Sequence, residues 1–374
     1  MCLKRLFRTN PGLRRPTCLL LALPAWIALA AFALADEGPL LTVPEQPSIA
    51  TEAPAKRTPL RLERTPGEKR LLRAARSARI ALPPNQVWLI STRGAAYRPG
   101  ADIRLKYWRY ESGRWRVSNR RQFLASDEPQ LPTCFFVHGN RVTFRESSTN
   151  GWKAYRRMAA EARSNQRFRF VIWSWPSERI RGPLRDVKAK ARVADAQAIY
   201  LAWLVDQIDP AVQVSFLGYS YGARLVTGAL HTLGGGQING RRLVHRVHRE
   251  RTPMRAVLMA AALDNSWLAP RQRHGLAVSQ VDRMLVMKNP ADRALKAYRL
   301  LYGLFRGPAA LGFSGPSGLG YMGPLGQRVR QMNVSNWVGD AHDWSRYMNS
   351  PVLVRRMRPY ALFEDSGPDS TTSP

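Results

Sequence analysis

The segment Val212–His231, VQVSFLGYSYGARLVTGALH, limits the fold more than any other part of the chain. An apolar run typical of a buried strand ends at Gly218, and a helical pattern begins at Tyr221. A strand that passes directly into a helix needs a very tight turn, which strains the backbone at its apex and excludes bulk two positions away. The motif therefore predicts that Ser220 projects from the carboxyl edge of a sheet, with Gly218 and Gly222 giving the turn its space.

The rest of the chain alternates short apolar runs with amphipathic ones. The expected strands are Gln86–Thr92, Asp102–Ser112, Arg114–Ser118, Thr133–Gly139, Arg169–Pro176, Val212–Gly218, Arg255–Leu263 and Asp282–Asn289. The expected helices are Trp152–Ala162, Asp186–Gln207 and Tyr221–Leu233. Buried strands separated by helices of about ten residues or more indicate a mostly parallel sheet with helices on both faces. The predicted fold class is α/β, in one domain over residues 82–362.

Both ends of the chain differ from this domain in composition. Residues 1–35 combine five basic residues, an apolar run and a small-residue cleavage site before Asp36, which is typical of a secretory signal peptide. We therefore expect an exported protein, periplasmic or secreted; the alternative is an uncleaved N-terminal membrane anchor. Residues 36–81 are rich in Pro and charge and predict a disordered linker, with a short basic helix over Glu68–Arg79. Residues 363–374 predict a disordered tail.

The charge and the cysteines restrict the function further. Lys and Arg number 58 against 26 acidic residues, so the formal net charge is +32, and arginine outnumbers lysine by 49 to 9. The arginines are scattered rather than gathered in one tract, which predicts at most a weak association with anionic surfaces and no specific nucleic-acid partner. Removal of the signal peptide would leave Cys134 alone, so neither an internal disulfide nor a cysteine-based metal site is expected.

A nucleophilic serine in this setting needs a base and an acid that follow it in the order Ser, Asp, His. Of the six histidines, His342 in VGDAHDW lies latest in the domain and is the expected base. For the acid, Asp264 and Asp292 both follow predicted strands, where carboxylates of open α/β sheets reach the carboxyl edge. Asp292 follows the later strand and is favoured, and Asp264 is the alternative acid.

Acyl transfer also needs donors for a developing oxyanion. The backbone amide of Tyr221 begins the helix after Ser220, where the helix dipole favours negative charge. The second donor is expected from the loop after an early buried strand, and FFVHGN supplies one, with Gly139 giving room and the Asn140 amide donating. His138 precedes this loop, and its expected role is to shape the loop by hydrogen bonds.

These pieces together resemble the α/β-hydrolase superfamily from about Gln86 to about Pro359. Within that superfamily, the chain looks most like a poorly characterised group of bacterial serine hydrolases. The matching motifs, in chain order, are FFVHGN, WSWPS, GYSYG, NPADRAL and DAHDW. The resemblance implies an α/β-hydrolase fold and places the acid at Asp292.

The sequence thus predicts a serine hydrolase, most simply a carboxylic ester hydrolase that acts through an acyl-enzyme on a small or lipid-like ester. No metal or organic cofactor is required for such chemistry. Two alternatives belong to other classes of protein. One is a catalytically inactive hydrolase fold that serves as a binding module of the cell envelope, and the other is a basic surface protein that binds polyanions.

Overall fold

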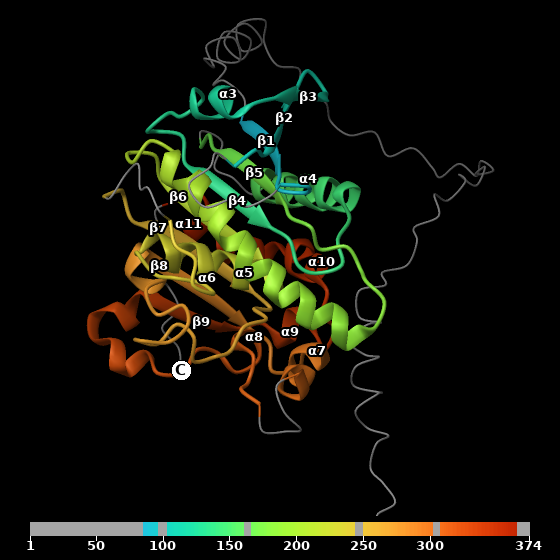
Figure 1. The fold of residues 1–374 in the computed structure, drawn as a ribbon, viewed down its shortest axis with the longest axis vertical. Coiled ribbons are helices and arrows are strands. Elements are labelled where there is room, and N and C mark those ends of the chain that lie inside the picture. The colour runs from blue at the N-terminus through green and yellow to red at the C-terminus, as the bar shows by residue number, and fades with distance from the viewer. Residues whose placement is uncertain (1–84, 96–102, 161–165, 244–249, 302–306, 365–374) are drawn as a thin grey trace, which may run out of the picture.

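A computed structural model of the chain describes residues 85–95, 103–160, 166–243, 250–301 and 307–364 (Figure 1). The predicted signal peptide, the linker with its short basic helix, and the tail beyond Glu364 lie outside the described residues. Phe363 and Glu364, the first residues assigned to the tail, pack on the domain: Arg255 lies 4.5 Å above the Phe363 ring, and Glu364 pairs with Arg358. No helix within the described ranges is long and apolar enough to cross a membrane.

The described residues form one nine-stranded sheet with the order β3-β2-β1-β5-β4-β6-β7-β8-β9. The strands are β1 Gln86–Ser91, β2 Lys106–Glu111, β3 Arg114–Ser118, β4 Thr133–Val137, β5 Arg169–Ser174, β6 Val214–Tyr219, β7 Met254–Met259, β8 Val281–Lys288 and β9 Val329–Asn333. Only β1 with β2 and β2 with β3 pair antiparallel among these strands; the other neighbours pair parallel. The prediction of a mostly parallel α/β sheet is confirmed.

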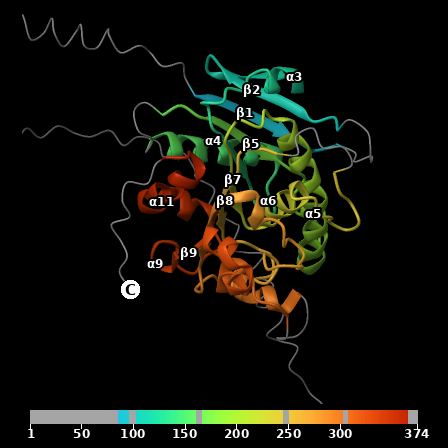
Figure 2. The same cartoon turned by 90° about the vertical axis from the view of Figure 1, so that its left-hand side faces the viewer.

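Helices cover both faces of the sheet. Figure 2 shows α4 (Phe144–Ala160) and α11 (Pro351–Ala361) on one side of the strands, and α5 (Pro183–Gln207) and α6 (Tyr221–Leu233) on the other. Every residue of α6 is buried, because α5 lies over it and the sheet lies beneath it. The four strands β1, β4, β5 and β6 are buried along their whole length, as expected of parallel strands between two helical layers.

The order of the strands reverses direction at the centre of the sheet. From β4 the chain first moves to one side, to β5, and then returns to the other side of β4, to β6. Ligands of open α/β sheets bind at such a switch point, beyond the carboxyl ends of the strands. The loop after β4 and the turn after β6 meet there, and these carry Asn140 and Ser220.

The remaining elements include several that the sequence pattern did not predict. They are α3 Arg120–Leu124, α7 Arg293–Lys296, α8 Leu311–Ser314, α9 Ser335–Val338, α10 Trp344–Asn349 and the short 3-10 helices η1 Val278–Gln280, η2 Ala297–Leu301 and η3 Leu319–Arg328. Helix α4 begins eight residues earlier than predicted. Glu146 in its first turn accepts hydrogen bonds from the backbone N–H and the hydroxyl of Thr143, which precedes the helix.

Cys134 is buried, as expected, and burial raises the pKa of its thiol to about 12.

Candidate functional site

Ser220 occupies a strained turn between β6 and α6. Its backbone has φ 53° and ψ −118°, in the left-handed half of conformational space that a residue with a Cβ rarely adopts. Three backbone hydrogen bonds hold it there: its amide donates to Met259 O at 2.9 Å, and its carbonyl accepts from Ala223 N and Ala262 N at 3.1 and 3.2 Å. The turn is therefore fixed by the helix that follows it and by the neighbouring strand β7.

The glycines around Ser220 are required by close contacts between backbones. A Cβ at Gly222 would lie 2.1 Å from the carbonyl oxygen of Val137, the last residue of β4. A Cβ at Gly218 would lie 2.8 Å from Cα of Ala223, and one at Gly139 would lie 3.2 Å from Cβ of Ser220. The first turn of α6 thus touches the end of β4 directly, and the loop after β4 lies against Ser220.

Ser220, His342 and Asp292, which are far apart in the sequence, form one hydrogen-bonded chain. His342 Nε2 lies 2.9 Å from Ser220 Oγ, and His342 Nδ1 lies 2.8 Å from Asp292 Oδ2. Asp292 is fully buried, whereas Ser220 and His342 retain 3% and 7% exposure. Because a carboxylate only accepts, Nδ1 carries the proton in the neutral ring and Nε2 accepts from the serine hydroxyl. This tautomer leaves His342 able to take a proton from Ser220.

The imidazole of His342 and the carboxylate of Asp292 lie on two different loops, and Asn289 joins these two loops. Asp292 begins α7 and its Oδ1 accepts from Leu295 N at 2.9 Å, so one oxygen caps the helix while the other holds the histidine. The buried Asn289 donates from Nδ2 to Gly339 O at 2.8 Å, and Arg293 N donates to Asp340 O at 3.1 Å. Asn289 begins the motif NPADRAL, but its role in joining the two loops was not predicted, although an Asn before Pro at a strand end is a recognisable turn signal.

The two expected oxyanion donors lie on either side of Ser220. Tyr221 is the first residue of α6, and its amide lies at the positive end of that helix. Asn140 is buried in the loop after β4, and within the described ranges its backbone N–H has no hydrogen-bond partner. Because the Cβ position of Gly139 nearly touches Ser220, this loop stands directly beside the serine. An unpaired, fixed N–H at such a place suits a developing negative charge.

Asp264, the alternative acid, is engaged elsewhere. Its Oδ2 accepts from Trp267 Nε1 at 2.7 Å, and its Oδ1 accepts from Tyr298 OH at 2.6 Å. Both carboxylate oxygens therefore have partners, and these partners connect the segment after β7 to η2. The carboxylate that contacts His342 is that of Asp292.

Of the other histidines, His245 and His248 lie outside the described residues, and the rest have structural partners. His138 is buried, stacks on Trp175 and accepts from Trp175 N at 3.3 Å, while Nδ1 lies 2.9 Å from Gly139 O. Burial lowers the pKa of His138 to about 3. His274 Nδ1 lies 2.9 Å from Thr227 Oγ1. Burial, and to a lesser extent the positive charge of Arg224 nearby, lowers the pKa of His274 well below its ordinary value. Both rings are therefore neutral in the folded protein.

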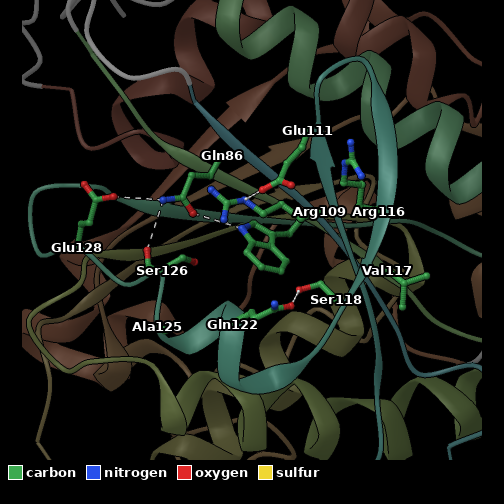
Figure 3. Close-up of a pocket in the computed structure, with 11 residues that line it drawn as sticks. Gln86, Arg109, Glu111, Arg116, Val117, Ser118, Gln122, Ala125, Ser126 and Glu128 are labelled. Atoms are coloured by element: carbon green, nitrogen blue, oxygen red, sulfur yellow. Dashed lines mark hydrogen bonds and ion pairs between the residues drawn. The ribbon is translucent and has the colours of Figure 1, made fainter.

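A separate groove of about 590 Å³ lies between α3 and the β2–β3 hairpin (Figure 3). None of the predicted site residues lines it. Its polar floor is internally bonded: Gln86 Nε2 donates to Glu128 Oε1 at 3.2 Å and to Ser126 O at 3.5 Å, and Trp88 Nε1 donates to Gln86. Arg109 in its wall pairs with Glu111 at 3.1 Å. Because these groups satisfy one another, the groove offers no concentrated set of unpaired polar groups to a ligand.

Neither models of protein families nor curated proteins yield a match to this chain.

We predict that Gly222→Ala destabilises the protein strongly, because the new Cβ would meet the rigid carbonyl oxygen of Val137 at 2.1 Å. Overpacking a core costs about 1–3 kcal/mol. Because the new Cβ would meet backbone atoms of Val137 and His138, which cannot move aside as a side chain can, we expect a cost at the upper end of this range or beyond. Urea unfolding of the purified variants measures the cost. Gly320→Ala is the matched control, since no atom lies within 4 Å of the Cβ added there; equal stabilities of the two variants would contradict the packing argument.

Acid is expected to destabilise the fold through His138 and His274. Their pKa values are depressed in the folded state, so above about pH 6.5 the folded and unfolded chains bind equal numbers of protons at these sites. Below about pH 6.5 the unfolded chain takes up protons at these two histidines and the folded chain does not, so the free energy of unfolding falls as pH falls. For His138, whose pKa in the folded protein is about 3, the loss between pH 7 and pH 5 is about 2 kcal/mol, and His274 adds to that loss. Urea titrations at both pH values test this, and His274→Asn should reduce the loss; a free energy independent of pH would refute it.

Proposed function

We propose that this protein is a serine hydrolase with an α/β-hydrolase fold that cleaves carboxylic esters through an acyl-enzyme. The observation that carries the proposal is the hydrogen-bonded chain from Ser220 Oγ through His342 to the buried Asp292. It stands at the switch point of a mostly parallel sheet, with the serine on a strained turn at a helix N-terminus. Nucleophile, base and orienting carboxylate in this arrangement are the parts that acyl transfer by serine needs.

In the proposed reaction, His342 Nε2 takes the hydroxyl proton as Ser220 Oγ forms a bond to the carbonyl carbon of the ester. The carbonyl oxygen becomes an oxyanion and accepts hydrogen bonds from the Asn140 and Tyr221 amides. Asp292 holds the imidazole in its tautomer and stabilises the imidazolium. When the bond to the alkoxy group breaks, His342 returns the proton to that leaving group, so an alcohol departs and the acyl group stays on Ser220.

The second half of the reaction repeats these roles with water. His342 takes a proton from a water molecule, whose oxygen attacks the acyl carbon, and the same two amides hold the second oxyanion. Collapse of this intermediate breaks the bond to Ser220 Oγ, which recovers its proton from His342, and the carboxylic acid leaves. The low exposure of Ser220 and His342 favours the proposal, because hydrogen bonds to a developing charge are stronger where water is excluded.

Hydrolysis of p-nitrophenyl esters of increasing chain length, with labelling by a fluorophosphonate probe, tests the proposal. Ser220→Ala should abolish both signals, and Asp292→Asn should lower kcat by about 10⁴-fold because the amide favours the wrong imidazole tautomer and cannot stabilise the imidazolium. Asp264→Asn is the matched control: its amide oxygen still accepts from Trp267 or Tyr298, so kcat should stay within about tenfold. Labelling that persists in Ser220→Ala, or the absence of labelling and turnover in the folded wild type, would reject the proposal.

A further inference from the structure

Asp186, which the sequence analysis did not single out, is a buried carboxylate behind the Asn140 loop. It lies in the first turn of α5 and has no exposed surface. Its Oδ2 accepts from Asn140 Nδ2 at 3.3 Å and from Arg141 Nε at 2.9 Å. Its Oδ1 accepts from Ile180 N at 3.1 Å and lies 3.9 Å from Lys190 Nζ. One carboxylate therefore joins the loop after β4, the loop after β5 and the helix α5.

The loop that Asp186 contacts is held in a conformation that it would not favour alone. Arg141 has φ 58°, in the left-handed region, which costs a residue with a Cβ roughly 1 kcal/mol or more. Its amide donates to Ser177 O at 2.7 Å, and Ser177 Oγ donates to Val142 O at 3.0 Å. These bonds fix the loop beyond Asn140, whereas the Asp186 carboxylate fixes the side chain of Asn140 itself.

The charge makes this contact stronger than an ordinary loop hydrogen bond. Hydrogen bonds to an ionised acceptor are roughly twice as strong as neutral ones, and Arg141 supplies the compensating charge beside this buried carboxylate. The side chains of Asn140 and Arg141 are both bonded to the carboxylate in the first turn of α5, whereas the backbone N–H of Asn140 has no partner among the described residues.

We propose that Asp186 is a positioning residue, which sets the orientation of the Asn140 amide and so the stabilisation of the oxyanion. This inference rests on the proposed function, since it concerns the same site. Asp186 touches neither substrate nor the reacting atoms; it acts through Asn140. The competing explanation is a purely structural ion pair that stabilises the start of α5 and nothing more.

The same helix carries a matched control for that explanation. Asp195 is also buried on α5, and it accepts from Arg224 Nε and Nη2 at 2.7 and 2.9 Å and from Arg273 at 2.7 Å. Like Asp186 it is a buried aspartate with two cationic neighbours, but these are Arg224 of α6 and Arg273 rather than residues of the Asn140 loop. Replacing either aspartate by asparagine removes one buried negative charge opposite an arginine, so the two variants should lose similar stability.

The experiment compares Asp186→Asn with Asp195→Asn in the full chain. For Asp186→Asn we expect kcat on a p-nitrophenyl ester to fall 10- to 100-fold with KM changed less than threefold. The inhibition constant of an alkyl boronic acid, whose adduct with Ser220 carries an oxygen in the oxyanion position, should rise by a similar factor. For Asp195→Asn, Tm should fall comparably while kcat and the boronic acid constant stay within twofold.

Equal kinetic effects of the two variants, or a rise in KM alone, would overturn the inference while leaving the proposed function intact. A wild type without turnover or labelling would instead refute the proposed function, and this inference with it. If Asp186→Asn does not fold, Asn140→Ala replaces it, because alanine keeps the backbone N–H and loses only the bond to Asp186. That variant should show the same fall in kcat at constant KM, and an unchanged kcat would overturn the inference.

Discussion

The contact between the end of β4 and the first turn of α6 is the constraint on which the site depends. With a hydrogen atom alone at Gly222, the helix approaches until its backbone touches the Val137 carbonyl. That approach places the Asn140 loop, which continues β4, beside Ser220, which precedes α6. A single methyl group at this position would separate the two loops. The distance between the serine and the loop is therefore set by packing between backbones rather than by the polar residues themselves.

Strain at Ser220 is tolerated because rigid neighbours surround it. A residue with a Cβ at φ 53° is less stable than one in the β region by about 1–3 kcal/mol, and the surrounding hydrogen bonds must offset that difference. Met259 and Ala262, which flank the end of β7, supply two of them. On the other side, Asn289 joins the loop of the acid to the loop of the histidine. The hydrogen-bonded chain is thus supported by contacts of residues at or just beyond the carboxyl ends of three neighbouring parallel strands, β6, β7 and β8.

The strongly periodic parts of the fold could be predicted from the sequence, and the weakly patterned parts could not. Helix α6 has the predicted bounds, Tyr221–Leu233, because a glycine-flanked turn and an all-apolar face define both of its ends. Strand β9 was missed, since it is an edge strand whose Arg330 and Gln331 are exposed and break the apolar pattern. Helices α10 and α11 were missed because the former is only six residues long and the latter has Arg-rich exposed turns.

The same distinction applies to the site. The order Ser, Asp, His gave Ser220, Asp292 and His342, whose side chains do meet, because chain order at strand ends is a topological property that a sequence displays. Asn289 and Asp186 act through loops that touch only after folding, so their sequence neighbours carry no sign of their contacts. Asp186 in particular has the sequence appearance of an ordinary acidic residue in the first turn of a helix.

Part of the high arginine content has a role inside the fold. Arg169 is 1% exposed; it donates to Thr133 Oγ1 and Phe123 O and pairs with Asp127 at 2.5 Å. Arg224 is almost fully buried against Asp195 and lies 4.6 Å from the Trp267 ring. A guanidinium can make several such contacts at once, which a lysine ammonium cannot match. Each of these arginines is paired with an aspartate, so the pair adds nothing to the formal net charge of +32, which the remaining basic residues supply.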